Sequence, residues 1–186
     1  MNQTSKENRR IMLELAHSSI QYGVDHGRVS TVKLEELPPQ LQELGACFVT
    51  LEIESQLRGC IGSLEAYQPL AEDLVKNSFA AAFQDPRFPP LGAEEFIRTA
   101  IKISLLTPAS PINFKSEDDL IRQIRPGIDG LILSDRGYRG TFLPSVWEQL
   151  PSPELFVQHL KQKAGLPANY WTDTIKVERY QTELIT

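Results

Sequence analysis

The chain has 186 residues, of which 41% are hydrophobic and 23% are charged. This composition is typical of a globular protein with one domain, or with one domain and a small subdomain. The formal net charge of −5 argues against a general binder of nucleic acid or of anionic membranes, although a local basic cleft is compatible with it. No apolar run approaches the roughly 20 residues of a membrane-spanning helix. Residues 1–10 are too polar for a signal peptide, so we expect a cytoplasmic protein.

The first half of the chain predicts two helices and a β-hairpin. Apolar residues recur at four-residue spacing over residues 5–23 and again over residues 69–84, which indicates two amphipathic helices. Residues 46–53 and 57–64 are rich in β-forming side chains and are separated by a short polar stretch, so we expect two antiparallel strands. A short helical turn is expected near residues 40–44, after two prolines.

The next part of the chain predicts a strand, a helix and a second hairpin. Residues 99–106 alternate apolar and polar side chains, which is the clearest strand pattern in the chain. Ser116 is followed by three acidic residues and is a good N-cap for a helix that ends near residue 124. Residues 130–134 and 138–143 flank a turn that contains glycine, which predicts a hairpin.

The last part of the chain predicts two helices and a strand. A short helix is expected over residues 144–150, and a longer one starts after Ser152 and ends at Gly165. Residues 170–180 contain the last predicted strand. Hairpins mixed with separate helices favour an α+β fold, with a mainly antiparallel sheet packed against helices.

Residues 57–62 (LRGCIG) are unusual for a strand, because glycine weakens strand pairing and marks a bulge or a close approach of backbone. Arg58, Cys60 and Gly62 share one face of the predicted strand, and Gly59 lies on the other. The two glycines have two explanations: a backbone that approaches a ligand, or a bulge with close helix packing. The bulge with close helix packing is the favoured explanation of the two glycines.

The chain has two cysteines, Cys47 and Cys60. A hairpin turn centred on residues 55 and 56 places Cys60 opposite Leu51, and a turn one residue earlier places it opposite Val49. Neither register sets the two cysteines against each other, as a disulfide requires. We therefore predict two free thiols. Their spacing gives no metal site, and we expect no metal and no cofactor.

Five strings resemble, in the same order, those of the AMMECR family, which is named after the human chromosomal region tied to Alport syndrome, midface hypoplasia and elliptocytosis. They are residues 57–62 (LRGCIG), 85–88 (DPRF), 126–131 (PGIDGL), 139–144 (RGTFLP) and 163–166 (KAGL). The resemblance extends from the first helix to about Trp171, nearly the whole chain.

This resemblance implies an α+β fold with two associated subdomains, larger and smaller, within a single domain over residues 1–186. It also implies that in prokaryotes the protein is the A component of a three-part set, with a Memo-like protein and a radical SAM protein. The molecular activity of the family is not settled. Many members carry glutamine at the position of Ser145, so no role is carried over to that side chain.

Cys60 is the candidate nucleophile, because the thiolate form of cysteine attacks electrophiles once a nearby positive charge lowers the thiol pKa. Arg58, two residues away on the same strand face, could supply that charge. The alternative is that Cys60 is a small buried hydrophobe. No histidine is placed by the sequence as a base.

Asp85 and Arg87 lie in a proline-rich loop and could form a pair in a cleft, and Arg139 lies on the second hairpin. Three arginines in the family strings predict an anion-binding cleft, because guanidinium groups bind carboxylate or phosphate with two hydrogen bonds. The alternative is that each arginine pairs with an acid. The candidate catalytic residues are Cys60 and Asp85, and the candidate ligand-binding residues are Arg58, Gly59, Gly62, Arg87 and Arg139.

Three functions follow from these observations. The first is a pathway component or binding module that works with Memo-like and radical SAM proteins. The second is a small cytoplasmic enzyme that uses Cys60, Arg58, Asp85 and Arg87 on an anionic substrate. Nucleic-acid binding is weaker, because the chain is acidic and has no basic stripe.

Overall fold

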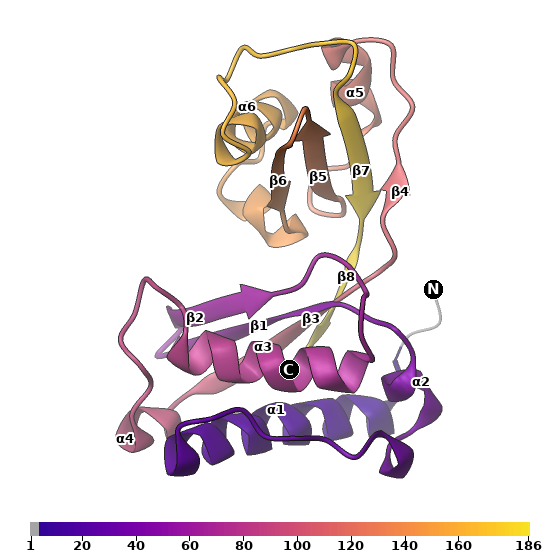
Figure 1. The fold of residues 1–186 in the computed structure, drawn as a ribbon. Coiled ribbons are helices and arrows are strands. Elements are labelled where there is room, and N and C mark those ends of the chain that lie inside the picture. Colours follow the sequence, from indigo (N-terminus) through magenta and orange to yellow (C-terminus); the bar gives the residue numbers. More distant parts are fainter. Residues whose placement is uncertain (1–3) are drawn as a thin grey trace. The chain divides into compact units, whose positions relative to one another are not determined.

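The computed structural model describes residues 4–186 (Figure 1). The chain forms two compact units, one of Met1–Leu106 with Glu183–Thr186 and one of Thr107–Thr182. Within the described residues the strands form two sheets of four strands each, with helices packed against them. The fold is α+β with mainly antiparallel pairing, as the sequence predicts.

In the first unit, helices cover one face of a sheet with strand order β2-β1-β3-β8. Helix α3 packs on β1 and β2, and α1 packs on α3 and β3 (Figure 1). Val49, Leu51 and Ile103 are fully buried against these helices. The elements are α1 (Lys6–His26), η1 (Leu34–Glu36), α2 (Pro39–Gln42), β1 (Cys47–Ile53), β2 (Gln56–Gly62), α3 (Leu70–Phe83), α4 (Ala93–Phe96), β3 (Ala100–Leu106) and β8 (Thr182–Ile185).

Helix α1 begins where the sequence predicts and ends later. The Ser5 hydroxyl accepts a hydrogen bond from the backbone N–H of Asn8 (3.1 Å) and caps the helix. Gly23 is not the stop, because it lies inside the helix, where a Cβ would overlap the ring of Phe83. Gly27 ends the helix, in the left-handed conformation (φ +67°) that favours glycine.

The β1–β2 hairpin contains a bulge, as the favoured explanation of the glycines in residues 57–62 predicts, but the sequence does not reveal its position. Glu54 and Ser55 form its two-residue turn with φ of +53° and +63°, which is the earlier of the two predicted turns. Arg58 is then an extra residue on β2, because Leu51 pairs with Gly59 while Glu52 pairs with Leu57. The bulge shifts the register by one, so Cys60 lies opposite Thr50, and both predicted registers are wrong.

Both cysteines are free thiols, as predicted. Cys47 is fully buried in the first unit, and its backbone N–H donates to the carboxylate of Asp73 (3.0 Å). Burial raises the pKa of the Cys47 thiol well above its ordinary value. Cys47 is therefore a core residue.

In the second unit, the sheet has strand order β4-β7-β5-β6. Its core includes Leu131, Leu133 and Val177, with the rings of Trp147 and Phe156 stacked at 3.7 Å between centroids. Lys176 starts the last strand of this sheet, and the separate strand β8 was not predicted. The elements are β4 (Ser110–Pro111), α5 (Glu117–Gln123), β5 (Gly130–Asp135), β6 (Tyr138–Phe142), η2 (Pro144–Glu148), α6 (Pro153–Lys163) and β7 (Lys176–Tyr180).

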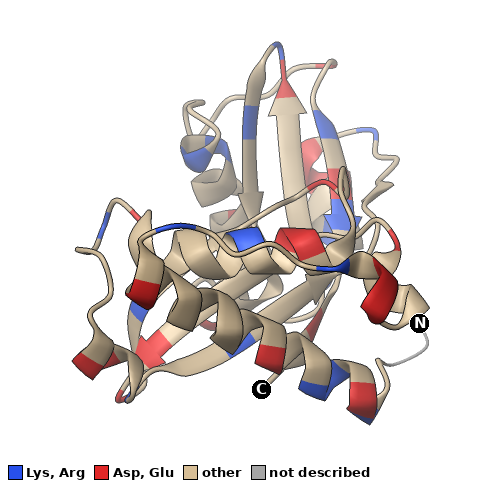
Figure 2. Cartoon of the chain, turned by 60° about the horizontal axis from the view of Figure 1, so that its bottom comes forward, with Lys and Arg blue, Asp and Glu red and all other residues tan. Residues whose placement is uncertain are grey.

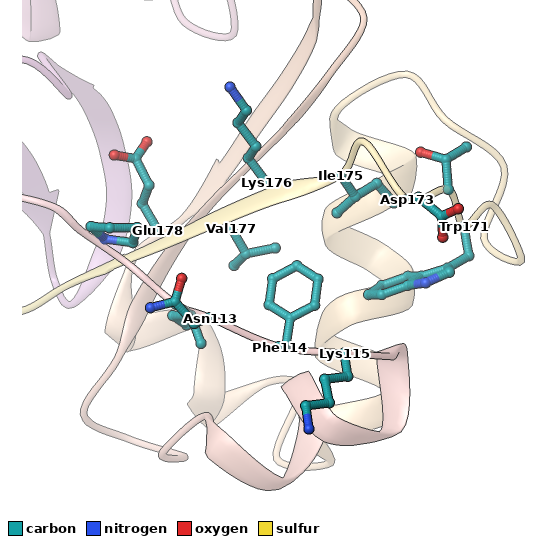
Figure 3. Close-up of a pocket in the computed structure, with 12 residues that line it drawn as sticks. Asn113, Phe114, Lys115, Trp171, Asp173, Ile175, Lys176, Val177 and Glu178 are labelled. Atoms are coloured by element: carbon teal, nitrogen blue, oxygen red, sulfur yellow. The ribbon is translucent and has the colours of Figure 1, made fainter.

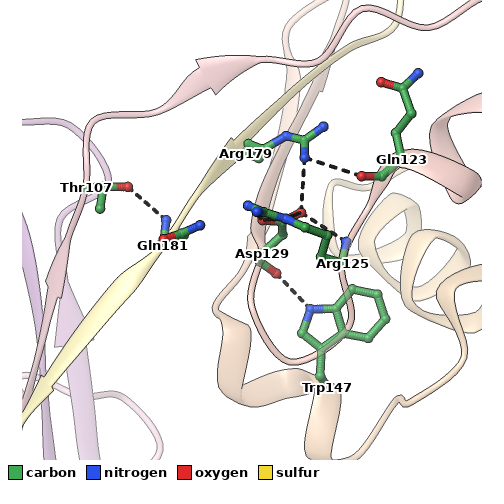
Figure 4. Close-up of polar contacts among 7 residues, drawn as sticks. All are labelled: Thr107, Gln123, Arg125, Asp129, Trp147, Arg179 and Gln181. Carbon is green, nitrogen blue, oxygen red and sulfur yellow. Dashed lines mark hydrogen bonds and ion pairs between the residues drawn. The ribbon is translucent and has the colours of Figure 1, made fainter. Parts of the chain in front are cut away.

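A buried carboxylate organises the turn before β5 (Figure 4). Asp129 is fully buried and accepts hydrogen bonds from the guanidinium of Arg125 (2.6 Å) and from that of Arg179 (3.4 Å). Its backbone carbonyl accepts from the indole N–H of Trp147 (2.7 Å). A buried charge is tolerated only when it is paired and hydrogen-bonded, so the string at residues 126–131 has a structural explanation.

Gly59 lies where α3 approaches β2 most closely, since a Cβ at this position would overlap the backbone carbonyl oxygen of Ala81. Backbone cannot move aside as a flexible side chain can. We therefore predict that Gly59→Ala lowers the free energy of unfolding by about 2–3 kcal/mol. Denaturant titration measures this change.

The matched control is Gly92→Ala, because a Cβ at Gly92 would meet only a carboxylate oxygen of Glu95 at 3.9 Å. This change at a helix N-cap should cost about 1 kcal/mol or less. Equal costs for the two substitutions would contradict the close contact between Gly59 and α3.

Candidate functional site

Strand β2 is the edge of its sheet, and the backbone of Cys60 points away from the neighbouring strand. The N–H of Ser63 bonds to the carbonyl of Cys47 (3.1 Å), and bonded pairs alternate with non-bonded ones along an antiparallel ladder. The pair Cys60–Thr50 is therefore non-bonded. Its outward N–H and carbonyl at Cys60 need partners from outside the sheet.

The loop after α3 supplies both partners. The carboxylate of Asp85 accepts from the N–H of Cys60 (2.9 Å), and the guanidinium of Arg87 donates to the carbonyl of Cys60 (3.3 Å). Arg87 also donates two hydrogen bonds to Asp85 (2.9 and 2.7 Å). We call this arrangement of Asp85, Arg87 and the Cys60 backbone the edge cap. The hydrogen bond from Arg87, with those from the Cys60 and Arg87 backbones, holds the pKa of Asp85 well below its ordinary value.

Arg58, the bulge residue, is anchored to the same loop. Its guanidinium donates to both carboxylate oxygens of Glu95 (2.8 and 2.9 Å) and to the carbonyl of Pro89 (3.0 Å). The ring of Phe88 lies under the guanidinium groups of both Arg58 (5.7 Å) and Arg87 (5.5 Å). Arg58 lowers the pKa of Glu95 to about 2. Residues 57–62 and 85–88 therefore contact each other directly. Glu95, which binds Arg58, was not among the residues singled out from the sequence.

Gly62, like Gly59, has a packing contact. A Cβ at Gly62 would overlap the ring of Phe48, whereas Gly59 lies under α3. Each glycine thus has the kind of close contact that the packing explanation requires.

The side chain of Cys60 lies on the sheet face opposite α3. Gly59 and Ile61 face the helix and its core, so the residue between them points the other way. The Cys60 thiol is half-buried, with its sulfur 3.3 Å from the hydroxyl of Thr50. Lys102 is the next residue in this cross-strand row.

Lys102 forms an ion pair with Glu52 (2.7 Å) on the same face. The sequence analysis placed Lys102 on the polar side of its strand, but the row with Cys60 and Thr50 follows only from the strand register. The first unit therefore brings together four of the candidate residues through the edge cap and the ring of Phe88: Arg58, Cys60, Asp85 and Arg87.

Arg139 belongs to β6 of the second unit and pairs with Ser134 of β5. Arg136, Arg139 and Lys176 line a small pocket of about 280 Å³ there. Arg136 and Lys176 are not candidates from sequence alone, because Lys176 comes close to the β5–β6 hairpin only through the pairing of β7 with β5. Ser145 is exposed in η2.

A larger pocket in the second unit has a volume of about 620 Å³ (Figure 3). The rings of Phe114 and Trp171, 5.6 Å apart, line it together with Val177 of β7. Figure 3 shows Lys176 and Glu178 projecting from β7 on the side opposite Val177. Among residues 4–186, no group of three or more His, Cys, Asp or Glu side chains could hold a metal ion.

Comparison with known proteins identifies the family. The AMMECR1 family model matches residues 13–185. The chain belongs to the AMMECR1 family. A protein of Thermofilum pendens is 33% identical to it over 200 residues, covering 99% of this chain and 92% of that protein. Protein MJ0810 of Methanocaldococcus jannaschii is 35% identical over 161 residues, covering 82% of this chain and 78% of its own.

A solved AMMECR1 relative has the same fold. The crystal structure of the uncharacterized protein PH0010 from Pyrococcus horikoshii matches with a TM-score of 0.88 and 32% identity, covering 97% of this chain and 91% of that one. In the part of the chain that the structure describes, no helix has both the length and the apolar character needed to cross a membrane.

The edge cap makes stability depend on pH. The pKa of Asp85 in the folded chain lies below its ordinary value of 3.8, so its contribution is complete above about pH 5 and is lost as the pH falls through the folded pKa. We predict that Asp85→Asn lowers the free energy of unfolding at pH 7 by about 1–3 kcal/mol. It should also flatten the decline in stability between pH 5 and pH 2.

Urea denaturation at a series of pH values measures both effects. Asp173→Asn, at an exposed aspartate, is the control and should leave the pH profile close to that of the wild type. An unchanged profile for Asp85→Asn would contradict the role given to the cap.

Proposed function

We propose that the protein is a binding module that works in the cytoplasm as a component of a pathway with a Memo-like protein and a radical SAM protein. Family membership supports the proposal, because resemblance to this family implies the set with a Memo-like and a radical SAM protein. The observation that carries it is the edge cap: Asp85 and Arg87 bond each other and the Cys60 backbone. These charged groups hold the shape of a sheet edge, and a preorganised surface loses less conformational freedom when a partner docks.

An enzyme that uses Cys60 is the second candidate. The half-buried thiol beside the Thr50 hydroxyl favours it. Against it, Asp85 is ionised and engaged at neutral pH, so it is poorly suited to accept or donate a proton. A thiol mechanism would need another base, and Lys102 is the nearest basic residue in the cross-strand row.

The anion-binding cleft around Cys60 remains part of the proposal. Arg87 supports it, because its side chain is 53% exposed although it pairs with Asp85. Arg58 is only 8% exposed and is paired with Glu95, so its guanidinium is less available to bind an incoming anion. A ligand at this place would compete with carboxylates that are already bound.

Nucleic-acid binding has less support. Figure 2 shows basic and acidic positions interleaved along the described helices and strands. Arg10, for example, pairs with Glu7 and Glu14 on α1. A nucleic-acid surface would gather basic residues on one face.

Partner binding is tested with the purified full-length chain and the Memo-like and radical SAM proteins of the same genome. We predict saturable binding of at least one of them, with a Kd of about 10 μM or tighter by calorimetry. No measurable binding of either protein, alone or together, would overturn the proposal.

Cys60→Ser distinguishes the module from the enzyme. Serine keeps a hydrogen-bonding group beside Thr50, and any residue other than proline supplies the backbone groups of the edge cap. We predict a change in the free energy of unfolding of about 0.5 kcal/mol or less, with partner binding and in vivo complementation unchanged. Loss of complementation at a normal protein level would favour the enzyme instead.

A further inference from the structure

Three cations come together at the end of the β5–β6 hairpin in the second unit. Ser134 pairs with Arg139 on one side and with Lys176 on the other, so Lys176, Ser134 and Arg139 form a row across three strands. Arg136 lies in the hairpin turn, and all four residues line the same pocket of about 280 Å³.

The middle of this row is open because serine is short. Neighbouring strands lie about 5 Å apart, so the two outer strands are about 10 Å apart. Residues in one cross-strand row point to the same face of the sheet, and Figure 3 shows Lys176 projecting on the side opposite Val177. The row therefore leaves a gap over Ser134, flanked by a lysine and an arginine.

The pocket lining also contains an acid, Asp135, whose negative charge attracts Arg136 and offsets part of the positive charge. Asp135 is 4% exposed and accepts hydrogen bonds from the hydroxyls of Tyr170 (2.7 Å), Thr172 (2.8 Å) and Thr174 (2.6 Å). These bonds tie the hairpin to the segment before β7. Glu178 follows Lys176 on the same face of β7 and lines the larger pocket.

The positive charges of Arg136 and Lys176 attract an anion placed between them. Lysine and arginine together bind phosphate well, since arginine supplies paired donors and lysine a compact charge. The pocket volume of about 280 Å³ is slightly below the range of drug-sized ligand sites, about 300–1,000 Å³, so the pocket suits only a small ligand. Arg139 takes part in a further interaction within the chain, so the site depends mainly on the charges of Arg136 and Lys176.

The geometry points to an anion site at Arg136, Arg139, Lys176 and Ser134 that takes a small phosphate-bearing molecule. This site lies wholly in the second unit, so it is distinct from the cleft around Cys60, and it does not depend on partner docking.

Pyrophosphate is the probe, added to the full-length chain at low salt and followed by calorimetry and by the backbone amide NMR signals of Ser134 and Lys176. We expect saturable binding with a Kd of about 0.1–1 mM, weakened by added salt. Acetate, which carries a single charge, should bind at least about tenfold more weakly.

Three variants locate the site. Arg136→Gln and Lys176→Gln each remove one cation and should weaken binding about tenfold. Ser134→Val keeps the net charge and suits a strand, but it fills the gap and should abolish saturable binding. Lys115→Gln removes an exposed cation of the same unit outside this pocket and should leave the Kd within about twofold.

The inference is overturned if pyrophosphate does not bind saturably at about 5 mM, or if Ser134→Val binds as the wild type does. In the second case the attraction would come from diffuse charge and not from a site. Partner binding by the same variants separates the two proposals. A chain that docks its partner but does not bind pyrophosphate retains the proposed function without this site.

Discussion

The first unit depends on how the exposed edge of β2 is satisfied. An edge strand presents backbone groups that must bond to water, to another chain or to side chains. Here Asp85 and Arg87 take the outward N–H and carbonyl of Cys60, and they also bond each other. The loop that carries them begins where α3 ends, so a single ion pair links the sheet edge to the helix that covers its core. This arrangement explains why the strings at residues 57–62 and 85–88 belong together.

Local signals predicted most of the fold, and long-range contacts explain the errors. The predicted caps at Ser116 and Ser152 both start helices, because capping depends on a few neighbouring residues. The predicted range of the first helix, residues 5–23, stops short of the observed end at Gly27, since the contact of Gly23 with Phe83 cannot be read from nearby sequence. The register of Cys60 failed for a similar reason. The bulge at Arg58 fits the anchoring of that side chain to Glu95, 37 residues away.

The candidate site could be predicted in part, because residue identity shows which side chains are unusual but not what they bond. The sequence singled out Arg58 and Arg87 as candidates, and the structure pairs them with Glu95 and Asp85, which is the alternative that the sequence left open. Thr50 and Lys102 look like ordinary strand residues until the register aligns them with Cys60. A site built across strands is therefore hidden from any argument that uses spacing along the chain alone.

The edge cap separates the backbone of Cys60 from its side chain. The cap uses only the N–H and the carbonyl, which every residue except proline supplies. Gly59, Arg58, Asp85 and Arg87 each have a structural reason in the contacts described here, but the thiol has none of comparable strength. The sulfur lies 3.3 Å from the Thr50 hydroxyl, and serine could also make this contact. A demand for sulfur at this position therefore has to come from the sheet face opposite α3, where Cys60, Thr50 and Lys102 lie in one row.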